Sequence, residues 1–176
     1  MSLTVATWLL ASVLTLVAIQ TLVAPYLWIS LRRSKSAGAI LGLAAIFMLG
    51  WHLGNLPQPD LAGFPRLPVL IIFVLGGLAA FIWLPDLLPV RALGCLMMFL
   101  ARAVLDAGWM QLPESALNAW ICYLLLVIPG LWWATSPGAF VRHTDGLLAR
   151  PALRYTVGAI LLATALATVG RALTLP

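Results

Sequence analysis

The fold class follows from Arg91-Ala-Leu-Gly-Cys-Leu-Met-Met-Phe-Leu-Ala-Arg-Ala-Val-Leu-Asp-Ala-Gly-Trp-Met-Gln-Leu112, an apolar run long enough to cross a bilayer that carries two charged residues well inside its length. At about 100° per residue, Arg102 lies about 20° around a helix from Arg91, and Asp106 lies about 40° further round. These three residues therefore form one polar stripe. At about 1.5 Å per residue, Arg102 is about 16 Å from Arg91 and about 18 Å from Glu114, which predicts a position close to mid-bilayer.

A charge at that depth needs a partner within protein. Each charge costs about 2.5–3.5 kcal/mol on insertion scales, and Asp106, one helical turn after Arg102, is the first partner we expect. The pair has two interpretations. It lines a polar route inside a helix bundle, or it is a structural pair that fixes helix rotation or docks against another subunit. We favour the structural interpretation because the pattern places no other ionic residue at this depth.

The composition of the whole chain agrees with a membrane protein. Of its 176 residues, 63% are hydrophobic and 9% are charged, against roughly a quarter charged in soluble domains. The net charge of +5 comes from basic residues in a few short connectors, which indicates membrane topology and contact with lipid headgroups. Nucleic acid is not implied, and bound lipid is expected.

Hydropathy and turn signals predict an all-α bundle of six transmembrane helices in a single membrane domain, residues 1–176. The predicted spans are about 3–31, 36–56, 67–84, 91–112, 115–135 and 152–173. Pro129 and Gly130 predict a kink in the fifth span. The charged segment 136–151 has an apolar side as well, which is typical of a short amphipathic helix lying on the membrane.

The basic residues predict the orientation of these spans. Seven of them fall on one face, namely Arg32, Arg33, Lys35, Arg91, Arg142, Arg150 and Arg154, whereas only Arg66 and Arg171 fall on the other. The positive-inside rule then places both termini outside the cytoplasm, in a bacterial-type inner membrane. The eight tryptophans fall near span ends and form an aromatic belt: Trp8, Trp51, Trp109 and Trp120 on the outer side, and Trp28, Trp83, Trp132 and Trp133 on the inner side.

Small residues at helical spacing predict surfaces for close helix packing, within the bundle or between copies of the chain. They are Gly38, Gly42, Gly50 and Gly54 in the second span, Gly76, Gly77 and Ala80 in the third, and Ala159, Ala163 and Ala167 in the sixth.

Four other polar residues are candidates for a ligand or polar site. His52, Asn55 and Gln111 fall near the outer ends of the second and fourth spans, and Arg91 begins the fourth. A single membrane histidine supplies one of the two ligands of a bis-His haem, so haem would need a ligand from another chain. Cys95 and Cys122 fall at different depths and predict neither a disulfide nor a metal site, and no cofactor is predicted.

One part of the chain carries a family resemblance. Pro85-Asp-Leu-Leu-Pro-Val-Arg-Ala-Leu-Gly94, continuing through Arg102-Ala-Val-Leu-Asp106 into the Pro113-Glu-Ser turn, resembles small polytopic bacterial inner-membrane proteins of unknown function. The resemblance covers about the second half of the chain and implies no activity. The motifs of transporters, tryptophan-rich sensors and cytochromes are not matched.

Three functions are compatible with the sequence. The leading hypothesis is a non-catalytic membrane protein that acts by association, as an accessory subunit of a membrane complex or as a homo-oligomer. A small transporter or channel, with Arg102 and Asp106 lining a polar path, is the alternative. A lipid- or quinone-modifying enzyme, with a site near His52, Asn55 and Gln111, is the third. An enzyme is the less favoured class because the sequence has no Gly-x-Ser-x-Gly, no His-Glu-x-x-His, no phosphate-binding loop and no paired carboxylates within its apolar runs.

Overall fold

The computed structural model describes residues 1–61, 63–83 and 87–175, and helices make up most of these ranges. They contain no strand, so the predicted all-α class is confirmed for the described part of the chain. Five helices there are long and apolar enough to cross a membrane, as expected of a multi-pass membrane protein. They are α1 (Leu3–Val23), α3 (Lys35–Gly54), α5 (Leu88–Ala107), the composite helix Ala116–Thr135 and α9 (Pro151–Thr174).

Another helix, α4 (Arg66–Trp83), occupies the predicted third span. Its apolar part, Arg66–Ala79, is shorter than the five long helices. A crossing by α4, and with it the count of six, therefore stays a prediction.

The predicted first span, 3–31, is too long, because the chain breaks at Pro25. α1 ends at Val23, and a separate helix, α2 (Tyr26–Arg33), begins after the break. Proline lacks the N–H that would continue the helix and disfavours helical geometry at the residue before it, and Ala24 is indeed non-helical at φ −131° and ψ 56°. The first crossing is therefore α1 alone.

The composite helix is irregular in its middle. It consists of α6 (Ala116–Ile121), a π-helical segment, η2 (Cys122–Val127), and α7 (Ile128–Thr135). The wider π turns come just before Pro129, whose missing N–H and bulky ring do not fit an α-helical ladder. The irregularity predicted at Pro129 thus takes the form of a π-helical segment that precedes it.

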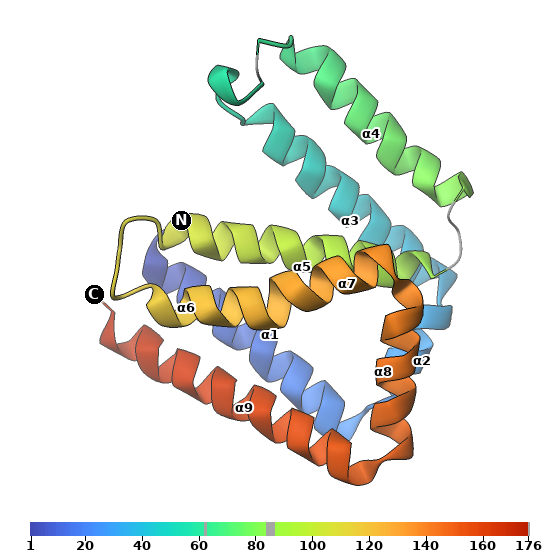
Figure 1. Ribbon diagram of the computed structural model, residues 1–176, viewed down its shortest axis with the longest axis vertical. Helices are drawn as coiled ribbons and strands as arrows, with labels where there is room; N and C mark the ends of the chain where they lie inside the picture. The colour runs from blue at the N-terminus through green and yellow to red at the C-terminus, as the bar shows by residue number, and fades with distance from the viewer. Residues whose placement is uncertain (62, 84–86, 176) are drawn as a thin grey trace.

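The long helices form two layers. α1 packs along α9, and α5 packs along α7 (Figure 1). The layers meet near the end that holds both termini, where a core includes Leu10 on α1, Val104 on α5, Ile121 on α6 and Ala165 on α9. At the opposite end, α8 (Pro137–Ala149) and α2 run across the ends of the long helices.

α8 occupies the segment predicted as an amphipathic helix. Its Phe140 is 1% exposed and Thr144 is 4% exposed, so the inner face of α8 packs on the protein. Its position at the membrane surface stays a prediction.

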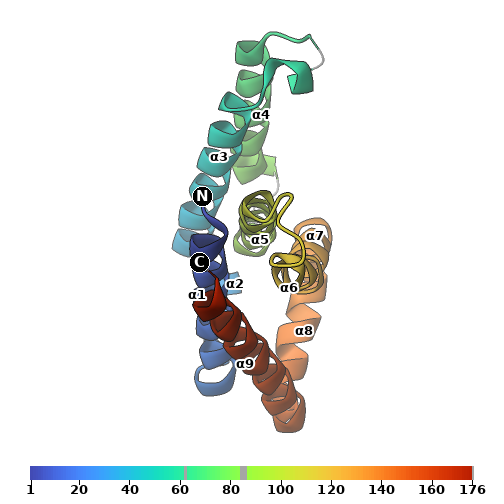
Figure 2. The same cartoon turned by 90° about the vertical axis from the view of Figure 1, so that its left-hand side faces the viewer.

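The hairpin of α3 and α4, joined through a short 3₁₀ turn (Gln58–Leu61), leaves the body of the molecule as an arm (Figures 1 and 2). α3 packs on α5, and α4 packs principally on α3. Small residues allow the close approaches: a Cβ on Gly38 would lie 3.2 Å from Pro89 Cδ at the start of α5, and a Cβ on Gly77 would lie 2.9 Å from Ile46 Cγ1.

Candidate functional sites

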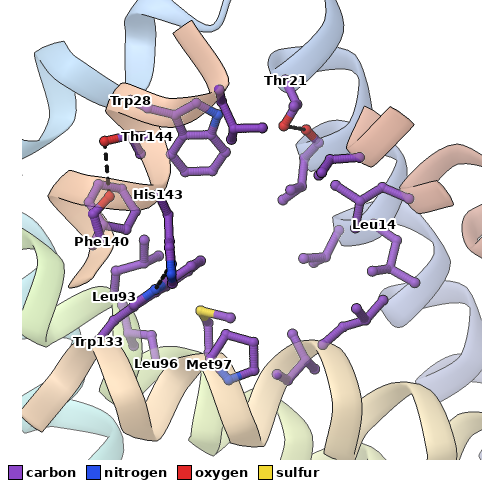
Figure 3. Close-up of a pocket in the computed structure, with 18 of the residues that line it drawn as sticks. Leu14, Thr21, Trp28, Leu93, Leu96, Met97, Trp133, Phe140, His143 and Thr144 are labelled. Carbon is purple, nitrogen blue, oxygen red and sulfur yellow. Dashed lines mark hydrogen bonds between the residues drawn. The ribbon is translucent and has the colours of Figure 1, made fainter. Parts of the chain in front are cut away.

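A chamber of about 530 Å³ lies between the two layers of helices. This volume falls in the range of about 300–1,000 Å³ typical of ligand sites. Its walls are overwhelmingly apolar and include Leu14 and Val17 on α1, Leu93 and Met97 on α5, and Val157 on α9 (Figure 3). The chamber is partly enclosed, and the sequence patterns did not predict it.

The chamber exists because the two layers meet at one end and separate toward α8 (Figure 1). At the closed end, Asn118 Nδ2 on α6 donates a 2.7 Å hydrogen bond to Thr7 Oγ1 on α1, and both residues are buried. Such a bond joins helices firmly where no water competes for it. Asn118 is an amide inside an apolar run, which was a signal that could have identified this contact.

At the other end, Arg32 fastens α8 in place. Its Nη1 lies 2.9 Å from Asp145 Oδ1 and donates to Thr144 Oγ1 at 3.2 Å, and the Arg32 side chain is only 11% exposed. The charged contacts thus connect the last turn of α2 to the middle of α8. From the sequence, Arg32 was assigned only to the basic face that sets the topology. The opposite charge of Asp145 on the same predicted side was the available signal.

Aromatic side chains gather beside α8 at this end of the chamber. Trp133 and Phe140 pack edge to face with ring centroids 5.0 Å apart, and Trp28 packs on Phe140 in the same way at 6.0 Å. Trp133 Nε1 donates to His143 Nδ1 at 3.3 Å, so a neutral His143 carries its proton on Nε2. Trp28 Nε1 is buried and has no hydrogen-bond partner. The chamber therefore has unused donors at its α8 end (Figure 3).

A second candidate site lies on the other side of α5, where α3 leaves it. Here His52 on α3 approaches Phe99 on α5 with ring centroids 6.2 Å apart, and both Arg102 and Asp106 act electrostatically on His52. We call these four residues the wedge cluster. Three of them, His52, Arg102 and Asp106, are candidates from the sequence that the fold brings together.

The single chain does not bury the charged pair. Arg102 Nε lies 3.4 Å from Asp106 Oδ2, but the two side chains are 48% and 66% exposed. Burial by a neighbouring chain stays a prediction. Arg102 also lies nearer the helix end than predicted, because α5 ends at Ala107, after a rise of about 8 Å from Arg102. The predicted depth of Arg102 was measured along a helix that continues to Glu114, whereas α5 ends at Ala107 and the chain turns at Gly108.

The remaining polar candidates each hydrogen-bond to a backbone carbonyl. Asn55 Nδ2 donates to Trp51 O at 2.7 Å, and Gln111 Nε2 donates to Ala107 O at 3.2 Å, so each amide satisfies its own helix end. Figure 1 shows α3 and α5 diverging toward their C-terminal ends. Arg91 Nη1 donates to Ala134 O at 2.9 Å and joins α5 to the last turn of α7.

The predicted small-residue stripes differ in whether they face another helix of the chain. Gly38 and Gly42 are buried on α3, and Gly50 and Gly54 face Val74 and Leu70 of α4. A Cβ on Gly76 would meet nothing within 4 Å, so Gly77 is the α4 glycine that faces α3, and the side chain of Ala80 lies outside the described residues.

On α9, the predicted stripe is not the face that packs on the rest of the chain. Ala159, Ala163 and Ala167 are exposed, whereas Gly158, Ala165 and Thr168 are buried. The alanine stripe therefore remains a candidate only for packing between copies.

The described residues contain no group of three metal-ligating side chains. Cys95 and Cys122 are free thiols, and Cys122 is fully buried. His52 and His143 lie on opposite sides of α5, in the wedge cluster and the chamber wall respectively.

In comparisons with protein-family models, with curated proteins and with solved structures, the chain matches none.

Proposed function

We propose that the protein acts by association in the membrane, as a homo-oligomer held together through the wedge cluster. The observation that carries this proposal is the Arg102–Asp106 pair, which sits on a helix of membrane-spanning length with side chains 48% and 66% exposed. Charged side chains on such helices almost always face protein or a water-filled cavity. A second chain over this face would remove both groups from lipid.

The pair is complementary to itself. It presents one positive and one negative group a single helical turn apart, so in a two-fold dimer Arg102 of each copy reaches Asp106 of the other. This arrangement supports a second copy of the chain as the partner. An accessory role beside a different subunit would need an opposing charge pattern on that subunit.

The arm leaves the body of the molecule beside the wedge cluster. α3 packs on α5 and then diverges from it (Figures 1 and 2), and the side chains of Arg102 and Asp106 on α5 stay exposed to a second chain. His52 supports the same assignment, because its Nε2 is buried and has no hydrogen-bond partner. A polar group from a neighbouring helix would satisfy it.

A polar transport path is less well supported. On α5 the chamber is lined by Leu93, Leu96, Met97 and Leu100, and Arg102 lies about 180° around the helix from Leu93. The charged pair therefore points away from the internal space of the bundle. The enzyme hypothesis also loses support, because the side-chain amides of Asn55 and Gln111 are taken up by carbonyl groups at their own helix ends.

Charge exchange tests the homo-oligomer. We expect Arg102→Asp and Asp106→Arg each to weaken self-association about tenfold or more, because each places like charges together in the interface. The exchanged double variant, Arg102→Asp with Asp106→Arg, restores complementarity and should restore association. The measurement is the molar mass in mild detergent by light scattering, supported by cross-linking in liposomes.

Arg33→Asp is the matched control, because Arg33 is an exposed arginine in the last turn of α2, away from the wedge cluster. Its association should equal that of the wild type. A wild-type protein that stays monomeric in liposomes would overturn the proposal, and Arg102 would then reach the headgroups by extending its long side chain. An exchanged variant no better than the single ones would also overturn it.

A further inference from the structure

The chamber has the properties of a site for a hydrocarbon chain. Its volume is about 530 Å³, and its walls are formed by leucine, valine, methionine and aromatic side chains from α1, α5, α7, α8 and α9. Protein interiors are close-packed, and a dry apolar space of this size favours apolar ligands over water. The medium around a membrane protein supplies such ligands as lipid chains.

The α8 end of the chamber differs from the rest because it offers hydrogen-bond donors. Trp28 Nε1 is buried without an acceptor, and His143, which accepts from Trp133 at Nδ1, carries a donor on Nε2 when neutral. Both residues line the chamber (Figure 3). A ligand that fits this end therefore brings acceptor oxygens.

Positive charge lies beside the same end. On α9, Leu153, Arg154, Val157 and Leu161 fall within about 100° of one another around the helix, and the three apolar members of this stripe line the chamber. Arg154 thus shares the face of α9 that lines the chamber, and Arg150 is the residue that directly precedes the helix.

Within the described residues, neither arginine forms a salt bridge with an acidic side chain. The salt bridges within the described residues join other arginines, Arg32 and Arg102, to aspartates. Arg154 Nε is buried and unpartnered, although its guanidinium packs 4.8 Å from the Tyr155 ring centroid. The uncompensated charge selects an anionic group.

From these features, we propose that the chamber binds an anionic phospholipid, with an acyl chain between the two helix layers and the phosphate near Trp28, His143, Arg150 and Arg154. Arginine pairs with phosphate through charged hydrogen bonds, and tryptophan is favoured at headgroup level. The acyl chain enters the chamber from the membrane, and the phosphate stays at the α8 surface. This site is on the opposite side of α5 from the wedge cluster, so it does not depend on self-association.

Lipid retention tests the site. The full-length protein is incorporated into nanodiscs of phosphatidylglycerol and phosphatidylcholine with identical chains, released into mild detergent and examined by native mass spectrometry. We expect a single phosphatidylglycerol to stay bound, about tenfold in preference to phosphatidylcholine. Equal retention of the two lipids, or co-purification of a quinone in their place, would overturn the proposal.

Two pairs of variants locate the lipid. Val17→Trp fills the chamber from α1 and should abolish retention, whereas Val5→Trp makes the same substitution at a 55% exposed position of α1 outside the chamber and should not. Arg150→Gln with Arg154→Gln should remove the preference for phosphatidylglycerol, whereas Arg33→Gln with Lys35→Gln, two exposed basic residues elsewhere, should preserve it.

If Val17→Trp does not fold, as judged by circular dichroism and elution volume, Val157→Trp fills the chamber from α9 and decides the outcome. Retention of phosphatidylglycerol by a folded chamber-filling variant would overturn the assignment to the chamber. Retention of the preference in the double arginine variant would overturn the assignment of the headgroup.

Discussion

The role of each polar side chain in this protein depends on whether another helix packs against it. The side chain of Arg32 is 11% exposed and fastened between α2 and α8, whereas the side chain of Arg102, on the more apolar helix α5, is 48% exposed. Asn118 is buried in a hydrogen bond to Thr7. The same residue type therefore stabilises the fold at one position and presents a surface at another.

We expect Arg32→Ala to destabilise the protein by about 1–3 kcal/mol, because it removes a charged hydrogen-bond network that holds α8 on α2. Asp145 is 53% exposed and stays solvated, so the loss comes mainly from the missing contacts. Thermal unfolding in detergent measures the change. Arg33→Ala, at the exposed neighbouring position, should stay within about 0.5 kcal/mol of the wild type, and equal losses in both variants would contradict this role.

Contacts between two residues could be predicted where both residues lie on the same helix. The helical spacing that relates Arg102 to Asp106 follows from the sequence, and the structure pairs them at 3.4 Å. The end of their helix at Ala107 did not follow, because a run of apolar residues does not mark where a helix ends. The Arg32–Asp145 contact did not follow either, because counting charges on each side of a membrane says nothing about which of them pair.

Among the elements, α5 and α7 approach each other closely at Gly94. A Cβ built on Gly94 would clash with Gly130 O and lie 2.9 Å from Ala134 N, so two backbones touch there. We expect Gly94→Ala to destabilise the protein by about 1–3 kcal/mol, because the backbones have to separate. Unfolding in detergent measures the loss.

Gly76→Ala is the control for that substitution. Gly76 lies inside α4, and a Cβ there would meet nothing within 4 Å, so the same change should be neutral or slightly stabilising through helix propensity. Equal destabilisation at both positions would show that the close approach is not what makes Gly94 sensitive.

Elements could be predicted better than their contacts. Hydropathy located the helices, and Pro129 marked the irregular one, since a missing N–H is a local property. The predicted first span, 3–31, was drawn through Pro25, although proline is also a local signal for the break found there. The face of α9 that packs on the rest of the chain could not be predicted, because both faces of the helix carry small residues. Only the position of α1 determines that Gly158 and Ala165 are buried. The chamber depends on the separation of whole layers, which no local pattern encodes.

At the scale of the whole molecule, the two layers, the helices across their end and the arm have different environments. The layers enclose the chamber, and the arm leaves the wedge cluster open on the other side of α5 (Figures 1 and 2). A lipid site and an association surface can therefore coexist on one chain without sharing residues.

The positions of the termini lead to the last prediction. Both termini lie at the same end of the molecule, and α1 and α9 run in opposite directions (Figure 1). Five crossings would leave the termini on opposite sides of a membrane, so we expect an even number, with α4 as the sixth crossing. Its 18 residues rise about 27 Å, close to the roughly 30 Å of a hydrocarbon core.

We therefore expect Asp60→Cys, beside the tip of the arm, to react with a membrane-impermeant maleimide from the outer face of intact cells, and Gly138→Cys, at the start of α8, to react only after permeabilisation. Each cysteine is introduced into a variant that also carries Cys95→Ser and Cys122→Ser, so that the two cysteines of the chain itself do not react. Labelling of both positions from the same face would contradict six crossings. It would also place Arg66 beside the basic residues of α8, against the charge asymmetry on which the orientation rests.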